Sequence, residues 1–365
     1  FEVFYIRTYL FSGIEKKNDF SYNDGCIYFH AVMINDYSDI LGKVCKTRRE
    51  LMKKIWILIM ILGMLFACTK QDSPEGKQKA PAAKAEKKIQ IVATIGMIAD
   101  AVKGIGGDRV QVTALMGPGI DPHLYKASAG DVRRMTKADM IFYCGLHLEG
   151  KMTEVFEQMS RNRKTVAVAE QIDKSLLLSH EDYKGLHDPH IWFDVKLWTK
   201  AVERIGQELA DFDKPNAAMY KSNLTKYIED MKQLDQYIRS KASELAPEKR
   251  VLITAHDAFK YFGKAYGFDV RGIQGISTTA EAGTADVDRL AEFIKARQIP
   301  AIFVETSVPQ RYVEALQSAV KAKGFEVSIG GHLFSDSMGD AGTKQGTYLG
   351  MLRHNIDTIV NGLKK

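Results

Sequence analysis

Three histidines, His123, His190 and His256, stand at predicted turns or strand ends. Two of them close an Asp-Pro-His triplet, in "GIDPHLY" (119–125) and "LHDPHIWFD" (186–194). Proline fixes its own φ and pushes the preceding residue into extended geometry, so each triplet holds one imidazole on a stiff segment. Neutral imidazoles are borderline donors that suit first-row divalent metal ions. Taken singly, each histidine is more often a packed or loop residue; the interpretation as ligands depends on their combination.

A carboxylate that completes such a set is available in the Gly- and Ser-rich segment "GGHLFSDSMGDAGT" at 330–343. It offers Asp336 and Asp340 beside His332, and spacing alone does not choose between the two carboxylates. The candidate ligands lie tens of residues apart, so no local motif unites them. A metal site would require a folded cleft that receives two ligands from each half of the chain.

Short β-rich runs alternate with helical stretches from residue 88 onward, a pattern typical of βαβ units with parallel sheets. One group covers 88–95, 110–116, 139–145 and 165–170, and a second covers 251–257, 269–276, 301–307 and 325–331. We therefore predict two α/β lobes. His256 falls at the carboxyl end of its run, which is the sheet edge where ligands bind in such folds. Ser128 and Asp131, shortly after His123, form a capping-box pattern that predicts the start of a helix.

The segment 215–247 carries one unbroken helical period. Its apolar residues recur every three or four positions, and Pro215 and Pro247 bracket them. At about 1.5 Å per residue, such a helix would be roughly 45 Å long and could run along both lobes. We predict a stiff linking helix that opposes large hinge motion, with a coiled-coil arm as the alternative.

Residues 52–67 have the organisation of an export signal. Lys53 and Lys54 precede an apolar run that is shorter than the ~20 residues needed to span a bilayer. The ending "LFAC" resembles a lipobox, which predicts that Cys68 becomes the lipidated first residue of the mature protein. A short buried helix is the alternative. Residues 68–88, rich in Lys, Ala, Gln and Pro, are predicted to form a flexible lipid tether.

Residues 1–51 precede this signal, although an export signal stands at the N-terminus of its protein. The chain also starts with Phe rather than Met. We therefore interpret 1–51 as translated upstream sequence that is not part of the native protein, a hypothesis that peptide mapping of the native protein tests.

Charge and cysteine content narrow the class of protein further. The net charge is +6, but most of the excess lies before residue 89, in the signal and tether. A basic nucleic-acid footprint is therefore not expected on the folded part. Cys144 is the one cysteine after Cys68, so no internal disulfide is predicted there, and its apolar surroundings predict a buried inert thiol.

Several stretches of the chain resemble the TroA-type metal-binding lipoproteins that supply ABC importers. They are "VATIGMIADAV", "MGPGIDPHLYKASAGDVRRM", "DPHIWFDVKLW", "TAHDAFKYF" and "HLFSDSMGDAGTKQGTYLGML". The resemblance runs from about residue 89 to 365. It implies two Rossmann-like lobes (89–214 and 248–365), a linking backbone helix (215–247) and a metal site between the lobes. It also implies the metal ligands His123, His190, His256 and Asp336, and so favours Asp336 over Asp340.

In function, the resemblance implies a solute-binding lipoprotein held on the extracytoplasmic side of a membrane, with no enzymatic activity. It would carry one divalent ion, Zn²⁺ or Mn²⁺ with Fe²⁺ as a further candidate, to a membrane permease and its cytoplasmic ATPase, and act as a monomer. Zinc-specialised relatives often have a long His-rich loop, whereas "SHEDYKGLHDPH" offers only His180 and His187 beyond the ligand. This short loop argues against a protein that carries zinc alone. Manganese-binding relatives commonly have Glu where this chain has His256, so the histidine favours zinc.

Two carboxylates are weaker candidates for contacts behind the ligands. Glu305 and Asp194 could accept the second N–H of a ligand imidazole, as metal-bound histidines usually require, although a cap or a surface ion pair is an equal alternative. His147 is interpreted as structural. Two other functions stay open, a zinc-dependent hydrolase and a surface adhesin with a structural metal. No HExxH pairing or nucleophile elbow supports the hydrolase.

Overall fold

The computed structural model describes residue 52, residues 87–179 and residues 185–364. The interpretation of 1–51, the export signal at 52–67, lipidation of Cys68 and almost all of the tether at 68–88 therefore concern residues outside the described part. Among the residues that the structure describes, no helix is both long enough and apolar enough to cross a membrane. The fold below belongs to the compact unit that spans Ala83–Lys365.

The first lobe contains a four-stranded parallel sheet in the order β2-β1-β3-β4. Its strands are β1 (Ile89–Ala93), β2 (Val110–Ala114), β3 (Met140–Tyr143) and β4 (Lys164–Ala167). The connecting helices are α3 (Gly96–Gly106), α4 (Ala129–Lys137) and α5 (Thr153–Ser160). β3 is apolar on consecutive positions because both faces of a parallel sheet are covered, and Met140, Ile141 and Phe142 are fully buried.

The second lobe contains two parallel strand pairs, β5-β6 and β7-β8. Its strands are β5 (Val251–His256), β6 (Asp269–Gln274), β7 (Ala301–Glu305) and β8 (Ser328–Leu333), and its helices are α8 (Lys260–Tyr266), α9 (Thr284–Arg297) and α10 (Arg311–Ala322). The prediction of two α/β lobes with parallel strands is confirmed. The last predicted strand, 325–331, is displaced, because pairing with β7 starts at Ser328 after the turn at Gly324.

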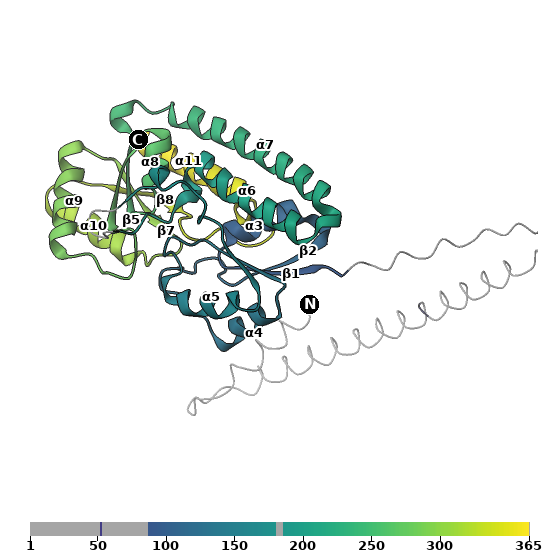
Figure 1. The fold of residues 1–365 in the computed structure, drawn as a ribbon. Helices are drawn as coiled ribbons and strands as arrows, with labels where there is room; N and C mark the ends of the chain where they lie inside the picture. Colours follow the sequence, from purple (N-terminus) through teal and green to yellow (C-terminus); the bar gives the residue numbers. More distant parts are fainter. Residues whose placement is uncertain (1–51, 53–86, 180–184, 365) are drawn as a thin grey trace, which may run out of the picture. The chain divides into compact units, whose positions relative to one another are not determined.

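The helices α6 (Val195–Phe212) and α11 (Tyr348–Leu363) each pack against α7 (Ala217–Ala242), which leads from the first group of strands to the second. α7 packs against α6, α3, α11 and α8, and Figure 1 shows it running along the outer edge of this part of the molecule. It is shorter than the expected 215–247, with 26 residues and a length of about 39 Å. Pro215 and Pro247 lie in separate 3-10 turns that flank it. One face of α7, with Tyr220, Met231, Leu234 and Ile238, is buried.

Candidate metal centre

His123 lies in the loop between β2 and α4. Its backbone N–H donates to Asp121 Oδ1 at 2.8 Å, so the first residue of the triplet fixes the loop that carries the imidazole. The predicted capping box follows, with Ser128 Oγ and the Asp131 carboxylate each accepting the other's backbone N–H. The loop is thus held at both ends, and His123 is 5% exposed.

His190 ends the second triplet and starts a short 3-10 turn, Ile191–Phe193. Asp188 Oδ1 accepts the His190 backbone N–H at 2.9 Å and lies 2.7 Å from His190 Nδ1. Because the carboxylate occupies Nδ1, the ring presents Nε2 to the cleft. Trp192, two residues on, donates from its indole N–H to the Ser335 carbonyl at 3.0 Å, which joins this turn to the loop of Asp336.

His256 is the last residue of β5, at the carboxyl edge where the sequence predicts a ligand site. Glu305, the last residue of β7, accepts the His256 backbone N–H through Oε1 at 2.8 Å. Its Oε2 lies 2.6 Å from His256 Nδ1. Both side chains are fully buried, so this ring too presents Nε2.

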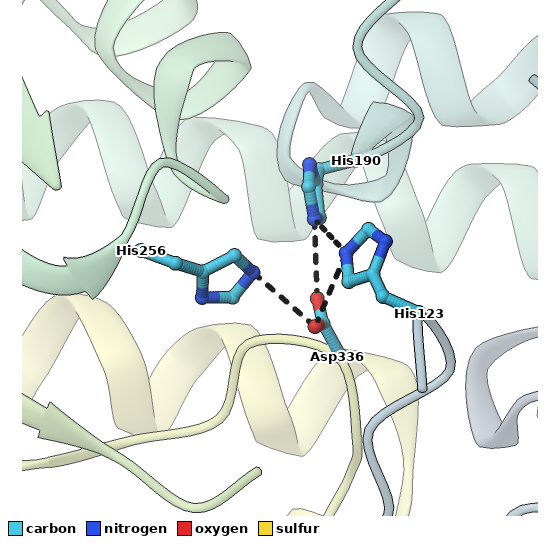
Figure 2. Close-up of side chains that lie close together, drawn as sticks. All are labelled: His123, His190, His256 and Asp336. Carbon is cyan, nitrogen blue, oxygen red and sulfur yellow. Dashed lines mark hydrogen bonds and ion pairs between the residues drawn. The ribbon is translucent and has the colours of Figure 1, made fainter. Parts of the chain in front are cut away.

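Asp336 lies in the loop that follows β8, and its carboxylate points at all three imidazoles (Figure 2). Oδ1 is 3.3 Å from His190 Nε2, and Oδ2 is 3.2 Å from His256 Nε2 and 3.7 Å from His123 Nε2. The Nε2 atoms of His123 and His190 are 3.3 Å apart. One donor atom from each of the four residues lies within 4.8 Å of the others, and all four residues are buried.

These separations have the size expected around one small cation. A tetrahedral ion with bonds of about 2.0 to 2.1 Å has neighbouring ligand atoms roughly 3.3 to 3.4 Å apart. Five buried side-chain atoms of His256, Glu305 and Asp336 lack a hydrogen bond of acceptable geometry among the described residues. Two of them, His256 Nδ1 and Glu305 Oε2, balance each other in a close ion pair. The other three are both oxygens of Asp336 and Nε2 of His256. Buried polar atoms need partners, and a cation at their common centre would satisfy these.

The protonation of the cluster follows from burial and from its carboxylates. Burial lowers the pKa of His123 to about 3, with Asp336 opposing the shift and the two other imidazoles adding to it. Burial also acts against charged His190 and His256. Asp188 and Asp336 nevertheless raise the pKa of His190 to about 9, and Glu305 and Asp336 raise the pKa of His256 well above its ordinary value.

Asp336 responds in the opposite sense. Burial alone would raise its pKa, but the adjacent His256 and His190 outweigh it and hold the pKa well below the ordinary range. The metal-free cluster is thus a carboxylate paired with imidazolium rings. A cation that binds there replaces protons and takes over their role in balancing the buried charge.

The residues behind the ligands are only partly those expected. Glu305 contacts the His256 ring, whereas Asp194 takes the alternative expected for it, a helix cap. Asp194 instead caps α6, where its Oδ1 accepts the backbone N–H groups of Lys196 and Leu197. Asp188 has the position that Asp194 was expected to fill. Its signal was the triplet itself, because Asp at i−2 can reach both the amide and the ring of the histidine that follows proline.

The other candidates take no part in the cluster. Asp340, His332 and His147 are exposed, and His332 uses its carbonyl to accept from His354 Nε2 at 3.0 Å. His187 is half-buried beside the site, in the wall of a cavity that His123 also lines. Cys144 is a buried free thiol, as predicted, and burial raises its pKa well above the ordinary range.

Comparison with known proteins agrees with this geometry. Residues 91–362 match the family described as ZnuA, zinc-uptake complex component A, periplasmic. The chain belongs to the ZnuA family. The resemblance of the sequence to TroA-type proteins is thereby confirmed.

Two curated proteins show what the chain is similar to. The chain is 49% identical to the zinc-binding protein TroA of Treponema pallidum over 86% of its own length and 99% of that protein. It is 46% identical to the manganese-binding lipoprotein MntA of Bacillus subtilis, over 77% and 91% of the two lengths.

The solved structure of T. pallidum TroA has a TM-score of 0.74 at 52% identity, covering 76% of this chain and 99% of that one. Fe(III)-bound YtgA of Chlamydia trachomatis has a TM-score of 0.69 at 28% identity, covering 76% and 98%. The two-lobed α/β fold described above is therefore the fold of the family.

Proposed function

We propose that this chain captures one divalent transition-metal ion between its lobes through His123, His190, His256 and Asp336. The observation that carries the proposal is the convergence of four buried donor atoms within 4.8 Å of one another. Two donors come from each lobe, so the ion would fasten the lobes together. The lobes correspond to 89–214 and 248–365, with 215–247 as the connection between them.

Zinc and manganese are the proposed cargo, with iron as a further candidate. Relatives of similar identity are named for zinc and for manganese, and a more distant one was solved with Fe(III). Three imidazoles and one carboxylate accept any of these ions, while intrinsic affinity rises from manganese to zinc. Metal supply at the site of capture, together with the ligand set, therefore determines which ion is carried.

The partners proposed are a membrane permease and its cytoplasmic ATPase. This part of the proposal is supported by the family's description as an uptake component and by relatives named as lipoproteins. Anchoring through a lipid on Cys68 would keep the protein on the extracytoplasmic side, and the tether at 68–88 would let it reach the permease. We propose that it acts as a monomer.

Binding without catalysis is the favoured activity. Catalytic zinc sites keep three protein ligands and leave one position for water, whereas here four protein donors approach one centre. This arrangement favours a carried ion over the zinc-dependent hydrolase. The same arrangement fits an adhesin with a structural metal. Rapid loss of the ion to a chelator would count against the adhesin.

The test is elemental analysis of mature protein purified without added metal or chelator, followed by competitive titration with Zn²⁺, Mn²⁺ and Fe²⁺. We expect one ion per chain and mutual exclusion of the three metals. A chain that binds no first-row ion, or one that binds zinc and manganese simultaneously, would contradict the proposal.

A further inference from the structure

The loop that carries His123 is tied to the second lobe at two points. The Gly119 backbone N–H donates to Ser337 Oγ at 3.0 Å. The Thr278 hydroxyl donates to Asp121 Oδ2 at 2.6 Å, across 157 residues of sequence. Asp121 thus has two tasks, because its other oxygen accepts the backbone N–H of His123. A second-lobe hydroxyl therefore holds the residue that orients a first-lobe ligand.

His123 depends on this arrangement more than the other two imidazoles do. Asp188 and Glu305 each hold the Nδ1 atom of their histidine at 2.7 and 2.6 Å. Among the described residues, no carboxylate forms an equivalent ion pair with the remaining ring nitrogen of His123. Its position is therefore set through its backbone, and hence through Asp121.

His123 is also the ligand that faces open space. It lines a cavity of about 330 Å³, whose first-lobe wall includes Leu146, His147 and Leu186. The second-lobe wall consists of Ile276, Ser277 and Thr279, the residues on both sides of Thr278. Thr278 itself is turned away into its bond with Asp121 and is 9% exposed. The bond thus joins the loop of His123 to the segment that supplies the second-lobe wall of the cavity.

We propose that Thr278 is a positioning residue that sets the rate of metal release, by latching the His123 loop to the second lobe through Asp121. While the bond is made, His123 stays beside the three other ligands. When it breaks, the loop can withdraw with its imidazole toward the cavity, and the ion is left with three donors and a path to solvent. This inference rests on the proposed function, because it concerns the ion held by that site.

The test compares Thr278→Val with Thr225→Val, since Thr225 is an exposed threonine on α7 whose hydroxyl donates to the Lys221 carbonyl and which does not line the cavity. Each variant is loaded with Zn²⁺ and mixed with a chromophoric chelator, at chelator concentrations where the rate no longer changes. We expect Thr278→Val to bind one ion but to release it at least about tenfold faster, because hydrogen bonds to charged groups are the stronger class. Thr225→Val should release at the unaltered rate.

Thr278→Ser, which keeps the hydroxyl, should restore slow release, and a purely steric role of the threonine would not give this rescue. Thr278→Ala serves as the second variant if Thr278→Val does not fold. An unchanged release rate in Thr278→Val, or equal acceleration in Thr225→Val, would overturn the latch. Failure of the unaltered chain to bind Zn²⁺ would instead overturn the proposed function, so the two results are distinguishable.

Discussion

Glu305 holds His256 by two atoms at once, its Oε1 accepting the backbone N–H at 2.8 Å and its Oε2 lying 2.6 Å from Nδ1. The two residues end neighbouring strands, β5 and β7, which contact each other in the second lobe. One carboxylate therefore fixes both the backbone and the ring orientation of a ligand. Asp188 does the same for His190 in the first lobe.

We predict that Glu305→Gln weakens metal binding by about 10- to 100-fold without changing the stoichiometry of one ion per chain, as is typical when the partner of a ligand histidine is altered. The amide keeps the size of the side chain but removes the negative charge that makes the imidazole a better donor. Competitive Zn²⁺ titration measures the effect. Glu326→Gln is the matched control, because Glu326 is exposed and distant from the cluster in the fold. Equal affinity in both variants would contradict the role given to Glu305.

Asp336 and Asp340 provide a matched pair within one loop. Asp336 is buried and lies within 3.7 Å of all three ligand nitrogens, whereas Asp340 is exposed. We expect Asp336→Asn to lose stoichiometric Zn²⁺ binding at concentrations that saturate the unaltered chain, since it removes the one anionic donor. Asp340→Asn should bind normally. Circular dichroism checks that both variants fold, and retention of one tightly bound ion in Asp336→Asn would refute the assignment.

The parts of the fold and site that depend on local pattern were predictable from sequence. Strand runs, the capping box at Ser128 and the three histidines follow from periodicity and turn chemistry. The end of α7 at Ala242 was not, because the apolar period continues past it to Leu245, and the structure turns before Pro247. The spacing of apolar residues shows which side chains are buried, and it does not show where a helix ends. Leu245 is buried but lies outside the helix.

Contacts between distant segments set the remaining limits. The residues give no reason to choose Asp336 over Asp340, since both follow the same strand, and the choice came from family resemblance. Asp188 and Asp194 both lie close to His190 in the sequence, but only the Asp188 carboxylate contacts the His190 ring. Nothing near Thr278 in the sequence indicates its partner Asp121, because the bond depends on how two lobes meet.

Metal binding should release protons at neutral pH. Asp188 and Asp336 raise the pKa of His190 from an ordinary 6.5 to about 9, so its ring is protonated at pH 7 in the metal-free protein. An ion needs the Nε2 lone pair and must displace that proton. We expect calorimetric Zn²⁺ titrations in two buffers of different ionisation enthalpy to report at least one proton released per ion at pH 7.

The same shift gives the direction of the pH dependence. Apparent affinity should rise with pH through about 9, because His190 loses its proton over this range. Stability of the metal-free fold has the opposite trend in this range. The raised pKa of His190 stabilises the metal-free fold fully below pH 6.5, and this stabilisation is lost as the pH rises through about 9. A metal-binding enthalpy that does not depend on the buffer at pH 7 would show that His190 is neutral before the ion arrives.

Asp194 separates stability from metal affinity. It caps α6 by accepting the N–H groups of Lys196 and Leu197 at 2.9 and 3.3 Å, and it makes no contact with the four clustered residues. We predict that Asp194→Ala lowers the free energy of unfolding of the metal-free protein by about 1 kcal/mol, the usual cost of a lost helix cap. Urea denaturation measures this loss. Zn²⁺ affinity should stay within about twofold of the unaltered chain, because Asp188, six residues before the α6 cap, still orients His190. A large loss of affinity with unchanged stability would show that the cap acts on the ligand after all.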